Sequence, residues 1–166
     1  MRMPAKTIFK KAVYTVFFFA FLLTNFCSLQ AQKVVSISVN ESINPASAEF
    51  IQQAIQTSEK SNAECLIIEL NTPGGLLTST RDIVSHIMGS RVPVVVYVSP
   101  SGARAGSAGV FITMAAHLAA MAPGTNIGAA HPVDMQGKAD GVMGEKSTND
   151  AVAFIRSIAE KRNRNA

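Results

Sequence analysis

The chain has 166 residues, 48% of them hydrophobic, so it has the length of one domain and enough apolar residues to fill a core. Its net charge of +4 does not indicate a nucleic-acid partner. Residues 1–31 hold the excess, because they contain Arg2, Lys6, Lys10 and Lys11 and no acidic residue. The remainder is neutral.

Residues 1–31 have the pattern of an export signal, in which basic residues precede an apolar run and a small residue, Ala31, ends the segment. The apolar run, at 12–26, is about 15 residues long, whereas a membrane-spanning helix needs about 20. We therefore expect a signal peptide over 1–31, with an uncleaved N-terminal anchor as the alternative, and one domain over 32–166. Without the leader, Cys65 is the one remaining cysteine, which excludes an intramolecular disulfide and fits a small core residue.

Beyond the leader, strand-length apolar runs alternate with helix-length amphipathic runs, which is typical of an α/β fold with a parallel sheet. The predicted strands are 34–39, 65–70 and 93–98. The first predicted helix begins at Asn44-Pro45. Three further helices are predicted at 76–88, 106–121 and 147–160. Residues 123–146 are rich in glycine and proline, so we expect a long mobile loop there with a short extended segment at 126–130.

Two glycine-containing loops follow neighbouring predicted strands, where open α/β sheets place their active sites. The first is Thr72-Pro73-Gly74-Gly75, whose paired glycines leave backbone amides open to a substrate carbonyl. The second is Ala105-Gly106-Ser107-Ala108-Gly109, which places a hydroxyl among small residues at the start of an apolar helix. Amides at a helix N-terminus stabilise developing negative charge, so Ser107 is a candidate nucleophile beside an oxyanion site.

A serine nucleophile needs a base, and the residues alone leave two candidates. His131 follows the short extended segment, and Lys146 stands just ahead of the last predicted helix. A lysine can act as a base only where burial lowers its pKa well below about 10.4. His117, within a predicted apolar helix, and His86, away from the loop ends, are expected to be structural.

Three longer motifs carry a family resemblance. They are Leu66-Ile67-Ile68-Glu69-Leu70-Asn71-Thr72-Pro73-Gly74-Gly75, then Ala103-Arg104-Ala105-Gly106-Ser107-Ala108-Gly109, then Ala122-Pro123-Gly124-Thr125-Asn126-Ile127-Gly128-Ala129-Ala130-His131-Pro132. In this order they resemble the NfeD-type membrane-bound serine proteases of the ClpP class, from about residue 33 to the last residue. The resemblance implies a ClpP/crotonase-like fold of repeated β-β-α units, with a mostly parallel sheet and flanking helices.

The same resemblance implies a catalytic apparatus. Ser107 would be the nucleophile and Lys146 the base of an acyl-enzyme mechanism, with the oxyanion held by the backbone amides of Gly75 and Ala108. An apolar lining is expected from Leu76, Leu77 and Val110. No metal-ligand spacing or phosphate-binding loop occurs in the sequence, so neither a metal nor a cofactor is expected.

The implied substrates are hydrophobic segments of membrane partners, notably a stomatin-like protein, cut by an exported, membrane-associated enzyme. Long members of the family continue into further strands, membrane spans and a β-barrel, so the fold is expected to be incomplete at its C-terminus. Self-association into a homo-oligomer is expected to cover the open sheet edge. The alternatives are a ClpP-like pair of Ser107 and His131, a non-catalytic scaffold of a membrane complex, and a crotonase-class acyl-CoA enzyme, which the serine motif disfavours.

Overall fold

The computed structural model describes residues 10, 14–17, 32–130 and 142–165, and its contacts divide the chain into two units, Met1–Ala31 and Gln32–Ala166. In the first unit the described part is Lys10 and a short helical stretch at 14–17. No helix among the described residues is long and apolar enough to span a membrane.

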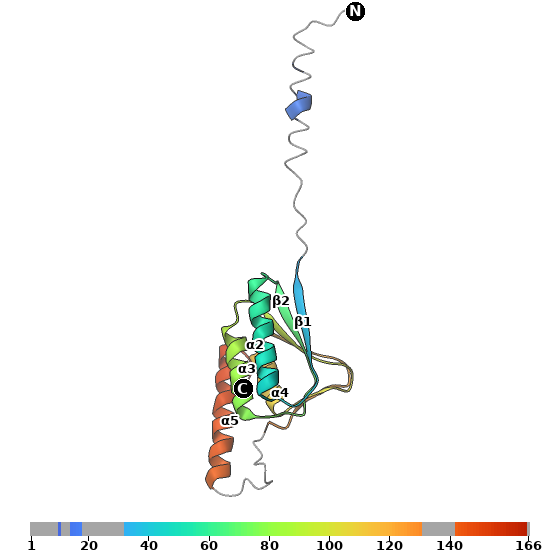
Figure 1. Ribbon diagram of the computed structural model, residues 1–166. Helices are drawn as coiled ribbons and strands as arrows, with labels where there is room; N and C mark the ends of the chain where they lie inside the picture. The colour runs from blue at the N-terminus through green and yellow to red at the C-terminus, as the bar shows by residue number, and fades with distance from the viewer. Residues whose placement is uncertain (1–9, 11–13, 18–31, 131–141, 166) are drawn as a thin grey trace, which may run out of the picture. The chain divides into compact units, whose positions relative to one another are not determined.

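A parallel four-stranded sheet forms the centre of the second unit, in the order β1-β2-β3-β5. Its strands are β1 (Val34–Val39), β2 (Cys65–Leu70), β3 (Val94–Val98) and β5 (Leu118–Met121). The helices are α2 (Pro45–Lys60), α3 (Leu77–Gly89), α4 (Ala108–Ala115) and α5 (Val142–Lys161). Figure 1 shows α2, α3 and α5 beside one another, with β1 and β2 to their right.

The register explains which strand residues form the core. Val39 lies opposite Leu70, and Leu70 opposite Val98, so one face of the sheet carries an unbroken row of apolar side chains. These alternate positions of β2 and β3 are fully buried: Leu66, Ile68, Leu70, Val94, Val96 and Val98. The side chains between them point to the other face and are more exposed, as the period of two along a strand requires.

A second, smaller set of extended segments completes each structural repeat. β4 (Arg104–Gly106) pairs in parallel with β6 (Asn126–Gly128), and single bridges join Ile43 to Gly75 and Thr72 to Ala105. Each strand of the large sheet is therefore followed by a short extended segment and then a helix. This arrangement confirms the expected fold class, a mostly parallel α/β fold of repeated β-β-α units.

The start of α2 forms as its sequence predicts. Asn44 is the N-cap: its side chain accepts from the Ser47 amide at 2.9 Å, and the Ser47 hydroxyl accepts from the Asn44 amide at 2.9 Å. Pro45 occupies the first turn, where its missing N–H has no partner to lose.

The predicted helix at 106–121 is wrong. The helix ends at Ala115, and residues 118–121 form the edge strand β5. A 2.9 Å hydrogen bond from the His117 amide to the Val94 carbonyl anchors the start of this strand beside β3. A continuous apolar run has no period that separates a buried helix from a buried strand. The last helix also begins earlier than predicted, at Val142, so residues 142–146, predicted to lie in a loop, are helical.

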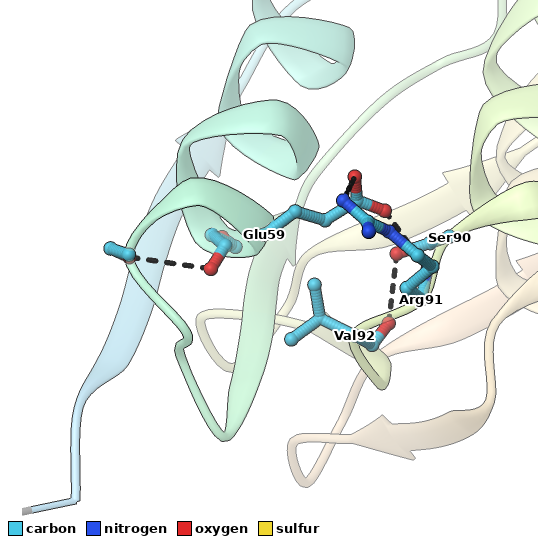
Figure 2. Close-up of polar contacts among 6 residues, drawn as sticks. Glu59, Ser90, Arg91 and Val92 are labelled. Carbon is cyan, nitrogen blue, oxygen red and sulfur yellow. Dashed lines mark hydrogen bonds and ion pairs between the residues drawn. The ribbon is translucent and has the colours of Figure 1, made fainter.

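An ion pair at the opposite end of β3 from the glycine loops fastens α2 to the connection between α3 and β3. Glu59 accepts from the Arg91 amide at 2.9 Å and from its guanidinium at 3.1 Å (Figure 2), and the Ser90 hydroxyl donates to the Val92 carbonyl at 2.8 Å. These bonds to Arg91, first from its amide and then from its side chain, lower the pKa of Glu59.

Because the folded-state pKa of Glu59 lies below the unfolded value, its stabilising contribution is present above about pH 4.3 and is lost as the pH falls through the folded value. Glu59→Gln is therefore expected to lower the urea midpoint slightly at pH 7, and the difference from the wild-type midpoint should shrink as the pH falls below about 4.3. The control is Glu49→Gln on the same helix, since Glu49 bonds the uncharged Gln53 amide. A Glu59→Gln difference that is constant from pH 3 to pH 7 would contradict this assignment.

Candidate active site

Ser107 occupies the junction between β4 and α4 in a conformation that side chains rarely adopt. Its φ is 46° and its ψ is −107°, and it is the N-cap of α4 without a capping bond from its own hydroxyl. A positive φ at a residue other than glycine costs on the order of 1–3 kcal/mol and persists only where surrounding contacts enforce it. The Ser107 hydroxyl is thereby held out of the helix cap and left available for chemistry.

Three hydrogen bonds impose this conformation. The Ser107 amide donates to the Gly128 carbonyl of β6 at 2.9 Å, and the Ser107 carbonyl accepts from the Val110 amide at 3.0 Å. Just before it, the Gly106 amide donates to the Thr72 carbonyl at 2.9 Å. The backbone on both sides of Ser107 is thus tied to neighbouring elements, so the serine cannot relax without breaking them.

Glycines allow the turn after β2 to approach the serine closely. A Cβ added to Gly74, whose φ is +124°, would lie 2.6 Å from the Ser107 Cβ and 3.2 Å from its Oγ. A Cβ on Gly75 would lie 2.0 Å from the Ile43 carbonyl oxygen, which is a hard clash. The paired glycines of the turn are therefore required by contact with Ser107 on one side and with Ile43 on the other.

Two backbone amides near Ser107 are candidate donors to an oxyanion. Among the described residues, neither the Gly75 amide nor the Ala108 amide donates a hydrogen bond. The Ala108 amide belongs to the first turn of α4, where the amides have no partner within the helix and the helix dipole favours negative charge. Both predicted oxyanion residues thus retain a donor that a developing negative charge could use.

A cavity of about 280 Å³ brings these groups together. It is lined by Gly75, Leu76, Leu77, Thr80, Ser107, Ala108, Phe111, Ala130, Ser147 and Ala151. Leu76 and Leu77 are 47% and 40% exposed, so this wall offers apolar surface to a ligand. The expected lining residue Val110 is not among these residues; its neighbour Phe111 takes that place one position along α4.

The two candidate bases stand differently in the structure. Lys146 is not in a loop ahead of the helix, as predicted, but within the second turn of α5, and it is exposed. It is not among the lining residues, although Ser147 beside it is. The described residues of this chain therefore do not bury Lys146 as a lysine base requires. His131 lies outside the described residues.

Two arginines just after α5 bind the C-terminal end of α4, which is the end opposite Ser107. Arg162 donates to the Ala115 carbonyl at 2.7 Å, and Arg164 donates to the carbonyls of Thr113 and Ala116, each at 2.9 Å. Positive groups at a helix C-terminus satisfy its last carbonyls and favour its dipole. The helix that begins at Ser107 is consequently fixed at both ends.

His117 is structural, as predicted. Its Nδ1 accepts a 3.1 Å hydrogen bond from the Val94 amide. Partial desolvation of the ring, followed by the positive charge of Arg162, lowers the pKa of His117 and so favours the neutral form that accepts this bond.

Some residues that shape the site were not singled out from the sequence. Phe111 and Thr80 line the cavity, and Phe111 stacks on Phe154 of α5 at a centroid distance of 5.4 Å. Arg81 lies over the Phe154 ring and pairs with Asp150, which fastens α5 to α3. Leu76 and Leu77 line the cavity as expected, but the helix that contains Phe111 is apolar on nearly every side, so its sequence did not indicate which of its residues would border Ser107.

Comparison with known proteins gives a consistent result. Residues 33–166 match the family described as the N-terminal domain of NfeD1b. The chain is 45% identical over 114 residues to the membrane-bound protease PH1510 of Pyrococcus horikoshii, and 36% identical over 135 residues to the membrane protein NfeD1b of Bacillus subtilis. These matches cover 68% and 81% of this chain but only 26% and 30% of the two relatives.

Solved structures extend the match to three dimensions. A serine-to-alanine mutant of 1510-N, a membrane-bound stomatin-specific protease, is 37% identical with a TM-score of 0.77, covering 82% of this chain and 67% of that one. A lysine-to-alanine mutant of the same protease, in complex with a substrate peptide, gives a TM-score of 0.75, with 82% and 64% covered. ClpP1 from Listeria monocytogenes, at 19% identity and a TM-score of 0.56 over 79% of this chain and 80% of that one, shares the fold.

Proposed function

This chain belongs to the NfeD1b N-terminal domain family, and we propose that it is a serine endopeptidase with Ser107 as its nucleophile. One observation carries the proposal: a serine held at positive φ borders the same cavity as the Gly75 and Ala108 backbone amides, which have no hydrogen-bond partner among the described residues. A hydroxyl pre-positioned beside unpaired amide donors is what acyl transfer to serine needs.

In the acylation step, neutral Lys146 accepts the proton of the Ser107 hydroxyl as the oxygen attacks a peptide carbonyl. The Gly75 and Ala108 amides stabilise the negative oxygen of the tetrahedral intermediate. The intermediate collapses by breaking the peptide C–N bond, and the protonated lysine returns its proton to the leaving amine. Water, with Lys146 again as the base, then attacks the ester carbonyl. The bond between the acyl carbon and the Ser107 oxygen breaks, the acyl fragment leaves as a carboxylic acid, and the protonated lysine returns its proton to that oxygen, which regenerates the Ser107 hydroxyl.

Two arguments support Lys146 as the partner of Ser107. It lies in α5 directly before Ser147, a lining residue of the cavity, and the solved 1510-N relatives include one serine-to-alanine and one lysine-to-alanine mutant. Because the described residues leave Lys146 exposed, the proposal requires that a bound substrate, or a part of the protein outside the described residues, shields it in the active complex.

The proposed substrates are hydrophobic peptide segments. The cavity wall formed by Leu76 and Leu77 is apolar, and an adjoining cavity of about 250 Å³ shares Phe111, Ala130 and Ala151 with it. The 1510-N protease is stomatin-specific, which supports a stomatin-like membrane partner here.

We further propose that residues 1–31 direct export, with residues 32–166 forming a protease domain at the extracytoplasmic face of the membrane. The membrane-bound relatives support membrane association. A homo-oligomer that covers β5 is part of the same proposal, since Leu118 on this edge strand is 59% exposed.

Changing the apolar wall tests the substrate class. Leu77→Asn is expected to raise KM for an aliphatic peptide by about tenfold, because a buried apolar contact of roughly 1–3 kcal/mol is lost, and to leave KM for a serine-substituted peptide unchanged. Hydrolysis of the two peptides and of β-casein by the full chain would be followed. The control is Phe50→Asn, at an exposed apolar residue of α2 that does not line the cavity. Equal effects of Leu77→Asn on both peptides would contradict an apolar substrate site.

A further inference from the structure

We propose that Thr72 is a positioning residue that aims the oxyanion amide of Gly75 and couples it to the strand that delivers Ser107. This inference rests on the proposed peptidase function. Thr72 is fully buried between the turn after β2 and the strand β4. Its side chain bonds the turn and its main chain bonds the strand, so one residue joins the two halves of the site.

The Thr72 hydroxyl forms two hydrogen bonds with the turn. It accepts a 3.1 Å hydrogen bond from the Gly74 amide and donates one of 3.2 Å to the Gly74 carbonyl. The same carbonyl accepts a 2.8 Å bond from the Ile43 amide, and the Leu76 amide donates to the Ile43 carbonyl at 2.9 Å. Gly75 therefore lies between two fixed bonds to Ile43.

These bonds set the direction of the Gly75 N–H. The Gly74 carbonyl and the Gly75 amide belong to one planar trans peptide group, in which the C=O and N–H point in opposite directions. Holding the carbonyl toward Thr72 and Ile43 turns the amide away from them, and Gly75 lines the cavity that contains Ser107. Loss of the hydroxyl releases one of the two donors that fix this peptide plane.

The main chain of Thr72 makes the link to the nucleophile. Its amide donates to the Arg104 carbonyl at 2.8 Å, and its carbonyl accepts from the Gly106 amide at 2.9 Å. Its methyl group fills the space beside Gly109, where an added Cβ would approach it to 2.8 Å. The hydroxyl and the methyl thus have separable tasks: the hydroxyl orients the oxyanion turn, and the methyl packs against α4.

Matched substitutions separate these tasks. Thr72→Val keeps the shape and removes the hydroxyl, whereas Thr72→Ser keeps the hydroxyl and removes the methyl. We expect Thr72→Val to lower kcat about 10²-fold with KM within about threefold, because the full loss of one oxyanion donor costs about 10²–10³ in kcat. Thr72→Ser should stay within about fivefold of the wild-type kcat. Thr113→Val is the control, since it removes another buried threonine hydroxyl, 2.7 Å from the Gly109 carbonyl, away from the turn.

The experiment measures kcat and KM of the full chain on one aliphatic peptide, the urea midpoint, and amide exchange at Gly74 and Leu76. The expected result is a kcat loss and faster exchange in Thr72→Val, rescue in Thr72→Ser, and an unchanged kcat in Thr113→Val. If Thr72→Val does not fold, Thr72→Ala and Thr72→Ser form the decisive pair, because they differ by the hydroxyl alone.

Three results would overturn the inference. The first is an unchanged kcat in Thr72→Val, and the second is a kcat loss in Thr72→Ser as large as that in Thr72→Val. The third is a kcat loss in Thr113→Val in proportion to its lowered urea midpoint, which would show that kcat follows stability. If the wild type shows no Ser107-dependent hydrolysis, the proposed function itself is contradicted. In that case amide exchange still tests whether the Thr72 hydroxyl holds the turn, since unchanged exchange at Gly74 in Thr72→Val would show that it does not.

Discussion

Replacing Ser107 by alanine is expected to abolish peptide hydrolysis while leaving the fold intact. The substitution removes one oxygen, which makes no hydrogen bond among the described residues, so the urea midpoint should change little. The covalent route is lost, and the rate should fall by about 10³-fold or more, because the oxyanion donors alone supply only residual catalysis. Hydrolysis of an aliphatic peptide by matched amounts of folded protein measures the effect.

The matched control is Ser101→Ala, at an exposed serine in the turn before β4, which should retain full activity. If Ser107→Ala retains the wild-type rate, hydrolysis does not proceed through this serine. A folded wild type without hydrolysis, together with a Ser107→Ala variant that keeps the biological role, would favour the scaffold hypothesis.

Replacing Lys146 by alanine is expected to lower kcat by about 10²–10⁴-fold, the contribution of a positioned general base. Lys146→Arg should be equally impaired, because a guanidinium does not lose its proton in proteins and cannot act as a base. The control is Lys161→Ala, at an exposed lysine at the other end of α5. Measured kcat for these three variants separates the loss of a base from the loss of a surface charge.

His131→Ala decides between the two candidate bases. With Lys146 as the base, this variant should keep kcat within about tenfold of wild type, since it does not remove the general base. Activity that is lost with His131→Ala and retained with Lys146→Ala would transfer the role to a Ser107–His131 pair.

Local signals in the sequence predicted much of the fold. The N-cap at Asn44, the strands at 34–39 and 65–70, and the turn Thr72–Gly75 depend on hydrogen bonds or periods that span a few residues, so a short window contains the information. The prediction of one helix over 106–121 was wrong because small and apolar residues suit both a helix and a buried strand. The division of this segment at Ala116 is set by pairing with β3, a contact between distant parts of the chain.

The sequence predicted that Ser107, Gly75 and Ala108 would lie together, and they line one cavity, but it did not predict the geometry of that cavity. Small residues around Ser107 indicated an accessible hydroxyl, yet its positive φ results from bonds to Gly128 and Val110 that no spacing reveals. The glycine and proline residues of 123–146 predict a loop that places Lys146 ahead of the helix, whereas the structure includes Lys146 in α5. Thr72 looked like part of a turn, and its role emerged only from its bonds to Gly74 and to β4.

The most direct test of a nucleophilic Ser107 is mass spectrometry of the full chain after reaction with a fluorophosphonate. This reagent modifies a serine that is activated beside an oxyanion site. We expect one adduct per chain, located on the peptide that contains Ser107, and a slower reaction in Lys146→Ala. No adduct on a folded chain, or an adduct on another residue with Ser107 unmodified, would contradict a nucleophilic Ser107.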